Sequence, residues 1–165
     1  MLIFCHPRRL VSLADLKPKM RVLELGCGAG RVTFPMAEAL PDGEVLGLDF
    51  QKGMLRLFDK RLQRSSLKNI SAQHLDIRKE NIPGEYDRVI IVTVLGEIPS
   101  YDDALRKVYQ SLVPGGIMSI TEVIPDPCYI PSKKMRTTCE ALGFIHEATV
   151  HNLVSYTMKL KKPNV

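Results

Sequence analysis

Three glycines and one acid are the first residues in this sequence whose types and spacing indicate a ligand site. Gly26, Gly28 and Gly30 form the pattern G-x-G-x-G, and Glu24 stands two positions before the first glycine. Alternating glycines allow a tight turn and let the backbone approach a bulky ligand closely. An acid beside such a turn suits a cationic or hydroxyl-bearing ligand better than a pyrophosphate. The turn therefore predicts a site for a nucleotide-like ligand that does not place phosphate there.

The same spacing argues against a dinucleotide site. The dinucleotide fingerprint G-x-G-x-x-G requires glycine at position 31, where this chain has Arg31. A nicotinamide-dependent oxidoreductase, which the general strand-turn-helix pattern would permit, is therefore disfavoured.

Two later acids follow apolar segments. Asp49 ends the run 44–49 and lies 23 positions after Gly26, close to the separation of about 20 residues typical of nucleotide sites. Its carboxylate offers two acceptor oxygens, enough for both hydroxyls of a ribose. Asp76 follows the next strand-like segment. For each acid the alternative interpretation is a solvated turn residue.

The elements that must position these residues alternate along the chain. Helices are expected near 34–40 and at 51–64, 100–112 and 132–142, the third with a start signal at Ser100 and Asp103. Strands are expected at 21–25, 44–49, 69–74, 86–94, 117–123, 144–150 and 153–160. This order predicts an α/β fold, a three-layer sandwich. Its mainly parallel seven-stranded sheet would have one antiparallel strand near the edge and helices on both faces.

The predicted sheet brings the polar residues together. In open α/β sheets the ligand lies at the carboxyl ends of the strands, where the strand order reverses. The glycine turn, Asp49, Asp76 and the segment 93–97 all follow strands. We therefore expect them to meet at one edge of the sheet.

Length and composition fit one soluble domain. The 165 residues are expected to form a single domain, 1–165, with a short lead-in at 1–20 and a C-terminal hairpin at 144–160. The hydrophobic fraction of 45% and charged fraction of 25% are ordinary, and no apolar run approaches the roughly 20 residues of a membrane-spanning helix. The apolar segment 1–4 is followed at once by Cys5-His-Pro-Arg-Arg, so a signal peptide is not expected.

The cysteines indicate free thiols. Cys5, Cys27, Cys128 and Cys139 show no C-x-x-C spacing, which argues against a structural zinc site. Free thiols fit a reducing compartment, and we expect a cytoplasmic protein without a metal.

The net charge of +5 points weakly to anionic partners. Much of this charge lies in basic clusters, which we interpret as solvated helix faces. A nucleic-acid partner is therefore disfavoured, whereas a peripheral membrane contact stays open. RNA methylation is the alternative function that rests on these clusters. Their members are Arg56, Lys60, Arg61, Arg64 and Lys68; Lys133, Lys134 and Arg136; and Lys159, Lys161 and Lys162.

From position 21 to 160 these motifs resemble the class I S-adenosylmethionine-dependent methyltransferases. The segment 112–116, Leu-Val-Pro-Gly-Gly, is similar to the family's L-x-P-G-G turn before the fifth strand. The stretches 96–99 and 122–127 look more like the group that methylates quinone rings, lipids and other small molecules. The resemblance implies S-adenosylmethionine as cofactor, S-adenosylhomocysteine as product, and in-line transfer of the methyl group to a small-molecule or lipid-like acceptor.

The resemblance also implies roles for particular residues. Glu24 and the glycine turn would contact the methionine moiety and the ribose, and Asp49 would bind the ribose hydroxyls. Phe50 would lie beside the adenine, Asp76 would bind its amino group, and Ile77 would pack nearby. The expected cofactor-binding residues are Glu24, Gly26, Cys27, Gly28, Gly30, Asp49, Phe50, Asp76, Ile77 and Thr93.

No catalytic residue is assigned. A hydroxyl or amine acceptor would need a base, for which Glu97 and Tyr129 are candidates near strand ends and His6 and His146 are more remote ones. A structural role is the alternative for each of them. The fourth strand lacks the Asn/Asp-Pro-Pro-aromatic signature of methyltransferases acting on adenine or glutamine nitrogens. A non-catalytic S-adenosylmethionine-binding module that serves a partner protein is the competing function.

Overall fold

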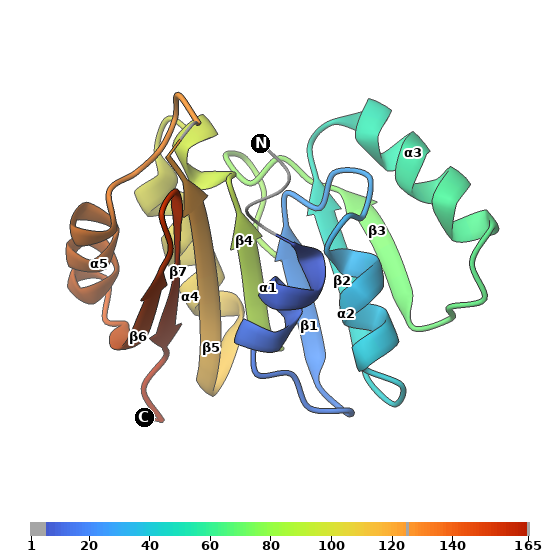
Figure 1. The fold of residues 1–165 in the computed structure, drawn as a ribbon, viewed down its shortest axis with the longest axis horizontal. Helices are drawn as coiled ribbons and strands as arrows, with labels where there is room; N and C mark the ends of the chain where they lie inside the picture. The colour runs from blue at the N-terminus through green and yellow to red at the C-terminus, as the bar shows by residue number, and fades with distance from the viewer. Residues whose placement is uncertain (1–5, 125, 165) are drawn as a thin grey trace.

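The computed structural model describes residues 6–124 and 126–164 and shows one twisted sheet between two layers of helices (Figure 1). Cys5 and the segment 1–4 lie outside the described residues. The elements in chain order are α1 (Pro7–Leu13), β1 (Arg21–Leu25), α2 (Thr33–Ala39), β2 (Glu44–Asp49), α3 (Lys52–Gln63), β3 (Ile70–His74), β4 (Tyr86–Val92), the 3-10 turn η1 (Leu95–Glu97), α4 (Tyr101–Ser111), β5 (Leu112–Val123), α5 (Ser132–Ala141), β6 (Ile145–His151) and β7 (Ser155–Lys161).

The seven strands lie in the order β3-β2-β1-β4-β5-β7-β6. Strands β1 to β5 pair in parallel, and β7 is antiparallel to both of its neighbours, β5 and β6. The predicted α/β fold is therefore confirmed. The strand order reverses between β1 and β4, which is where open sheets of this kind hold their ligands.

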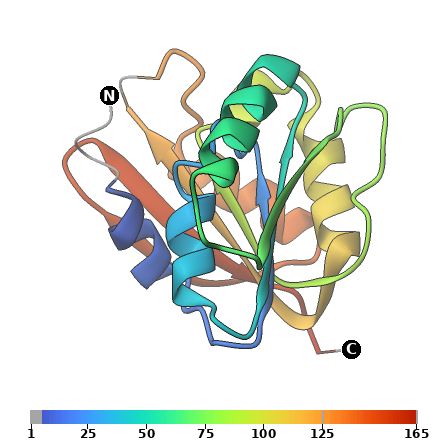
Figure 2. The ribbon, with the colours of Figure 1, turned by 90° about the vertical axis from the view of Figure 1, so that its right-hand side faces the viewer.

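Two hydrophobic cores, one on each face, hold the sheet between its helices. In β4, Val89 and Ile91 face the core under α4 and α5, whereas Ile90 faces the core under α1, α2 and α3. Figure 2 shows α1 and α2 on one side of the sheet and α4 on the other. A strand buried on both faces needs apolar residues at successive positions, which explains the uninterrupted run in β4.

Helix α1 is a feature that the sequence did not predict. Its Leu10 and the following Ala14 are buried. Arg88 of β4 reaches the end of this helix, where its Nε donates to the carbonyl oxygen of Ala14 at 3.3 Å and its Nη2 to that of Asp15 at 3.4 Å. Desolvation lowers the pKa of Arg88, and the carbonyls at the helix C-terminus compensate its buried charge.

Two local predictions need correction. Helix α4 begins after Ser100 as expected, but the Ser100 side chain makes no capping hydrogen bond. The segment 113–116 was expected to precede a strand at 117–123, yet β5 extends back to Leu112. Tyr86 pairs with Leu112 and Arg88 with Ile117, so the intervening residues form an irregularity inside the strand. Gly115 permits this because its φ is 76°.

None of the helices within residues 6–124 and 126–164 combines the length and the hydropathy needed to cross a bilayer. In the same part of the chain Cys27, Cys128 and Cys139 are free thiols. No three or more His, Cys, Asp or Glu residues among those described gather as metal ligands would.

Replacing the buried arginine should weaken the attachment of α1. Arg88→Met leaves the Ala14 and Asp15 carbonyls without these donors, so we expect the free energy of unfolding to fall by about 1–3 kcal/mol in urea denaturation. Arg106→Met is the control, because Arg106 is exposed on α4 in an ion pair with Asp103. Equal stability of the two variants would contradict the role of Arg88.

Candidate functional site

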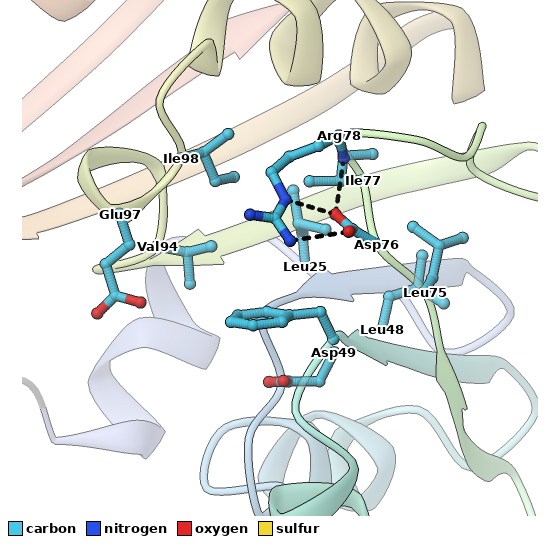
Figure 3. Close-up of a pocket in the computed structure, with 12 residues that line it drawn as sticks. Leu25, Leu48, Asp49, Leu75, Asp76, Ile77, Arg78, Val94, Glu97 and Ile98 are labelled. Carbon is cyan, nitrogen blue, oxygen red and sulfur yellow. Dashed lines mark hydrogen bonds and ion pairs between the residues drawn. The ribbon is translucent and has the colours of Figure 1, made fainter.

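A cleft of about 100 Å³ opens at the carboxyl ends of the strands on both sides of the point where the strand order reverses (Figure 3). It contains five of the ten residues expected to bind the cofactor, together with the candidate base Glu97. These residues therefore meet at one edge of the sheet, as the predicted topology requires. The cleft is lined by Leu25, Gly26, Leu48, Asp49, Phe50, Leu75, Asp76, Ile77, Arg78, Val94, Glu97 and Ile98.

The glycines of the turn after β1 serve different purposes. Gly26 has a φ of 76°, and a Cβ there would lie 2.2 Å from Cγ2 of Val94, so this glycine is required by contact with the segment after β4. Gly28 has a φ of 53°, and a Cβ there would meet no heavy atom within 4 Å. Gly30 resembles Gly26, because a Cβ there would meet Phe34 at 2.6 Å. Gly28 is thus the glycine of the turn at which a side chain would meet open space, although neither it nor Gly30 lines the cleft.

Asp49 is anchored in the cleft by two backbone N–H groups. The backbone N–H of Gly28 donates to its Oδ2 at 2.8 Å, and that of Gln51 donates to its Oδ1 at 2.7 Å. The residue is only 8% exposed. A carboxylate accepts about four hydrogen bonds, two at each oxygen. Each oxygen of Asp49 therefore retains capacity for one further donor, as two neighbouring ribose hydroxyls would require.

Glu24 does not line the cleft. It is buried, and the hydroxyl of Thr33 at the start of α2 donates a hydrogen bond to its Oε2. Burial raises the pKa of Glu24 to about 8, and the nearby charge of Asp49 adds to the effect. In this structure the Glu24 side chain is bound by Thr33 of α2. The expected contact of Glu24 with the ligand stays a prediction.

Cys27 also turns its side chain away from the cleft. A Cβ added to Gly47 of β2 would lie 2.7 Å from its Sγ, so the thiol packs against the bare backbone of that strand. Burial raises the pKa of the thiol, which excludes a reactive thiolate at neutral pH. The backbone N–H groups of Gly26 and Cys27 both donate to the Leu48 carbonyl, at 2.7 and 3.1 Å, and join the turn to β2.

The end of the cleft that follows the carboxyl ends of β2 and β3 is formed by Phe50, Asp76 and Ile77. Phe50 is 52% exposed, and its backbone carbonyl accepts a hydrogen bond from Nε2 of His74 at 3.0 Å. Asp76 is bound by Arg78, whose Nε and Nη2 donate to its two carboxylate oxygens at 2.7 and 2.8 Å. These hydrogen bonds lower the pKa of Asp76 to about 2.

Arg78 was missed by the sequence analysis. Its guanidinium forms an ion pair with Asp76 and also lies 5.6 Å from the centre of the Phe50 ring. The signal in the sequence was only a cation two positions after an acid, which is common on protein surfaces.

Thr93 marks the end of β4 without lining the cleft. Its φ of 52° lies in the left-handed region, which is rare for a β-branched residue. Its N–H donates to the Thr121 carbonyl at 2.9 Å, and its hydroxyl donates to the Val92 carbonyl at 2.8 Å. The strained turn directs the next residue, Val94, onto Gly26. Its expected contact with the cofactor stays a prediction.

Among the candidate bases, Glu97 alone belongs to the lining of this cleft. Figure 3 shows it on the side of Val94 and Ile98, away from Asp76. Tyr129 instead packs on Tyr156, with 6.0 Å between the ring centres. His146 hydrogen bonds to Thr149 on β6, and His6 precedes α1, so the structure does not bring either histidine into the cleft wall.

Glu122 near the end of β5 is a second residue that the sequence analysis did not single out. It is 1% exposed, and its Oε1 has no hydrogen-bond partner among the described residues. Burial raises the pKa of Glu122 to about 7, and the charges of Asp126 and Glu97 add to this rise. An acid within the apolar strand 117–123 was the available signal.

Comparison with known proteins identifies the family. A family model described as a methyltransferase domain matches residues 16–161. The chain belongs to this methyltransferase family. Curated relatives include the demethylmenaquinone methyltransferase of Lactococcus lactis, 35% identical over 59% of this chain and 39% of that protein. The enzyme of the same name from Thermus thermophilus is 31% identical over 73% of this chain and 54% of that protein. The chain thus spans about half or less of the length of these relatives.

Solved structures share the fold of this methyltransferase domain. A SAM-dependent methyltransferase from Aquifex aeolicus superposes with a TM-score of 0.85 at 17% identity, covering 94% of this chain and 88% of the other. The [4+2]-cyclase SpnF superposes with a TM-score of 0.84 at 16% identity, covering 94% of this chain and 80% of the cyclase. Coclaurine N-methyltransferase, bound to S-adenosylhomocysteine, superposes with a TM-score of 0.65 at 21% identity, covering 71% of this chain and 36% of that enzyme. The cyclase illustrates that this fold alone does not determine the reaction.

The glycines should differ in their tolerance of alanine. Gly28→Ala introduces only the left-handed backbone penalty, about 1–2 kcal/mol. Gly26→Ala adds the clash with Val94 and should cost more than 2 kcal/mol in urea denaturation, in part restored by Val94→Ala. Equal losses for the two glycine variants would contradict the packing described for Gly26.

The buried acid of β5 should make stability fall as pH rises. Between the ordinary pKa of 4.5 and the folded value of about 7, the unfolded chain releases the Glu122 proton while the folded chain keeps it. The free energy of unfolding should therefore decrease across this window and, for this group, level off above it. Glu122→Gln should reduce the difference in stability between pH 5 and pH 8 by on the order of 1 kcal/mol. An unchanged difference would show that Glu122 ionises normally.

Proposed function

We propose that this chain is the catalytic domain of an S-adenosylmethionine-dependent methyltransferase that acts on a small quinone-like acceptor. The observation that carries the proposal is the anchored carboxylate of Asp49, which has one acceptor position left on each oxygen and lies beside Gly28. A ribose diol needs two such acceptors held close together. The backbone at Gly28 leaves room for the ligand next to them.

The remaining cleft residues suit the other parts of the cofactor. Phe50 and Ile77 offer apolar surface on which an adenine can pack, and Asp76 offers an acceptor for its amino group. Leu25, Val94 and Ile98 provide an apolar wall that keeps water away from the bound molecule. The sulfonium of the cofactor supplies a methyl group that is already activated, so the protein's task is mainly to position the acceptor in line with it.

The acceptor class is proposed from the named relatives. The Lactococcus lactis and Thermus thermophilus proteins are demethylmenaquinone methyltransferases, and this chain matches about half or less of each. A quinol ring carbon that receives a methyl group must lose a proton. Glu97 is the acid in the cleft wall that could accept it, either directly or through water.

One alternative keeps the cofactor but not the chemistry. A non-catalytic S-adenosylmethionine-binding module is favoured by the limited coverage of the relatives. Methyl transfer by the purified chain separates the two functions.

Cofactor binding is tested by calorimetry with S-adenosylmethionine and S-adenosylhomocysteine. We expect micromolar-range binding of at least one of them. Asp49→Asn should weaken it by about tenfold or more, because a charged acceptor is lost. Asp103→Ala, an exposed carboxylate on α4, is the control that should bind like the wild type. The absence of detectable heat with both compounds would refute the proposal.

Methyl transfer is tested with labelled S-adenosylmethionine and a reduced demethylated naphthoquinone. We expect labelled quinol, lost in Asp49→Asn. Glu97→Gln should lower kcat by about 10²-fold without changing cofactor affinity, whereas Glu140→Gln on α5 should change neither. Cofactor binding without methyl transfer to the quinol would contradict the quinone proposal. If, in addition, no acceptor in a cell extract became labelled, the result would favour the non-catalytic module.

A further inference from the structure

The guanidinium of Arg78 lies in the part of the cleft where adenine is proposed to bind (Figure 3). It makes two parallel hydrogen bonds, Nε to Oδ1 of Asp76 at 2.7 Å and Nη2 to Oδ2 at 2.8 Å. The backbone N–H of Arg78 donates to the same Oδ1 at 3.1 Å. Oδ1 therefore accepts two hydrogen bonds and Oδ2 one, so the chain itself uses three of the about four acceptor positions of the acid that is proposed to bind the adenine amino group.

Arg78 also lies near the aromatic surface proposed for the adenine. Its guanidinium carbon is 5.6 Å from the centre of the Phe50 ring, within the range of a cation–π contact. Arg78 thus reaches two of the three residues assigned to the purine: its guanidinium donates to the Asp76 carboxylate and lies beside the Phe50 ring.

The size of the cleft makes this contact significant. Pockets for small molecules usually measure about 300–1,000 Å³, whereas this cleft measures about 100 Å³. Leu25, Leu48 and Leu75 of its wall are buried in the core and cannot move without a packing cost. The Arg78 side chain is 51% exposed and can turn into solvent. It is therefore a part of the wall that can make room for a ligand at low cost.

We propose that Arg78 is an internal competitor for the purine end of the cleft, which turns away from Asp76 to make room when an amino-bearing base binds there. This inference rests on the proposed function, because it assumes that an adenosyl group occupies this cleft. A ligand that displaces Arg78 has to offer Asp76 an N–H donor in exchange. The pair consequently lowers the affinity for every ligand and penalises most those without such a donor.

The size of the effect follows from the strength of the ion pair. An exposed ion pair is weak, so removing it should change a binding constant by a factor of only about two to five. Because the apparent affinity scales with the fraction of molecules whose site is free, Arg78→Ala should bind more tightly than the wild type by a factor in this range.

The test is calorimetric titration of S-adenosylhomocysteine into the wild type, Arg78→Ala and Arg78→Lys. We expect about two- to fivefold tighter binding by Arg78→Ala and an intermediate value for Arg78→Lys, which keeps the charge but loses the paired geometry. Added salt should tighten binding by the wild type and not by Arg78→Ala, because salt screens the ion pair. Arg136→Ala is the matched control, since Arg136 forms a similar exposed pair with Glu140 at 2.8 Å on α5.

A second readout follows the displaced group directly. The Arg78 Nε–H signal in NMR, assigned by its absence in Arg78→Lys, should be protected from exchange in the free protein and lose protection when S-adenosylhomocysteine binds. Weaker or equal binding by Arg78→Ala, or an Nε–H that stays protected in the complex, would overturn the inference. Either result leaves cofactor binding itself intact, whereas no binding by any variant would refute both the proposed function and this inference.

Discussion

The structure of the site depends on the two backbone hydrogen bonds that Asp49 accepts. One comes from Gly28 in the turn after β1, and the other comes from Gln51 just before α3. Together they join two segments that follow the neighbouring strands β1 and β2, and they fix a carboxylate at the carboxyl end of β2, beside the point where the strand order reverses. A carboxylate held by N–H donors in this way keeps its position without a ligand. The site is therefore organised when the chain folds, and ligand binding does not have to order this side chain.

Other parts of the fold support the same turn. The Leu48 carbonyl accepts from Gly26 and Cys27, and the strained backbone at Thr93 leads Val94 onto Gly26. Near the amino end of β4, Arg88 holds the end of α1 against the sheet. The cleft is thus bounded by segments that pack on one another, with exposed side chains such as Phe50 and Arg78 at its rim.

The sequence predicted the features that depend on local pattern. Apolar runs and glycine spacing placed the strands, the turn, Asp49 and Asp76 at one edge of the sheet. Features that depend on the direction of a side chain were not predictable in this way. Nothing local shows that Glu24 pairs with Thr33, that Arg78 folds onto Asp76, or that the acid in β5 is buried under the loop that follows it. These arise from contacts that form only when the fold is complete.

The central claim is that Asp49 receives the ribose hydroxyls of an adenosyl ligand, and a crystal structure of the chain with S-adenosylhomocysteine tests it most directly. The account predicts both ribose hydroxyls within about 2.5–3.0 Å of Oδ1 and Oδ2 of Asp49, with the hydrogen bonds from Gly28 and Gln51 still in place. A ligand bound elsewhere, or a ribose that does not contact Asp49, would contradict it.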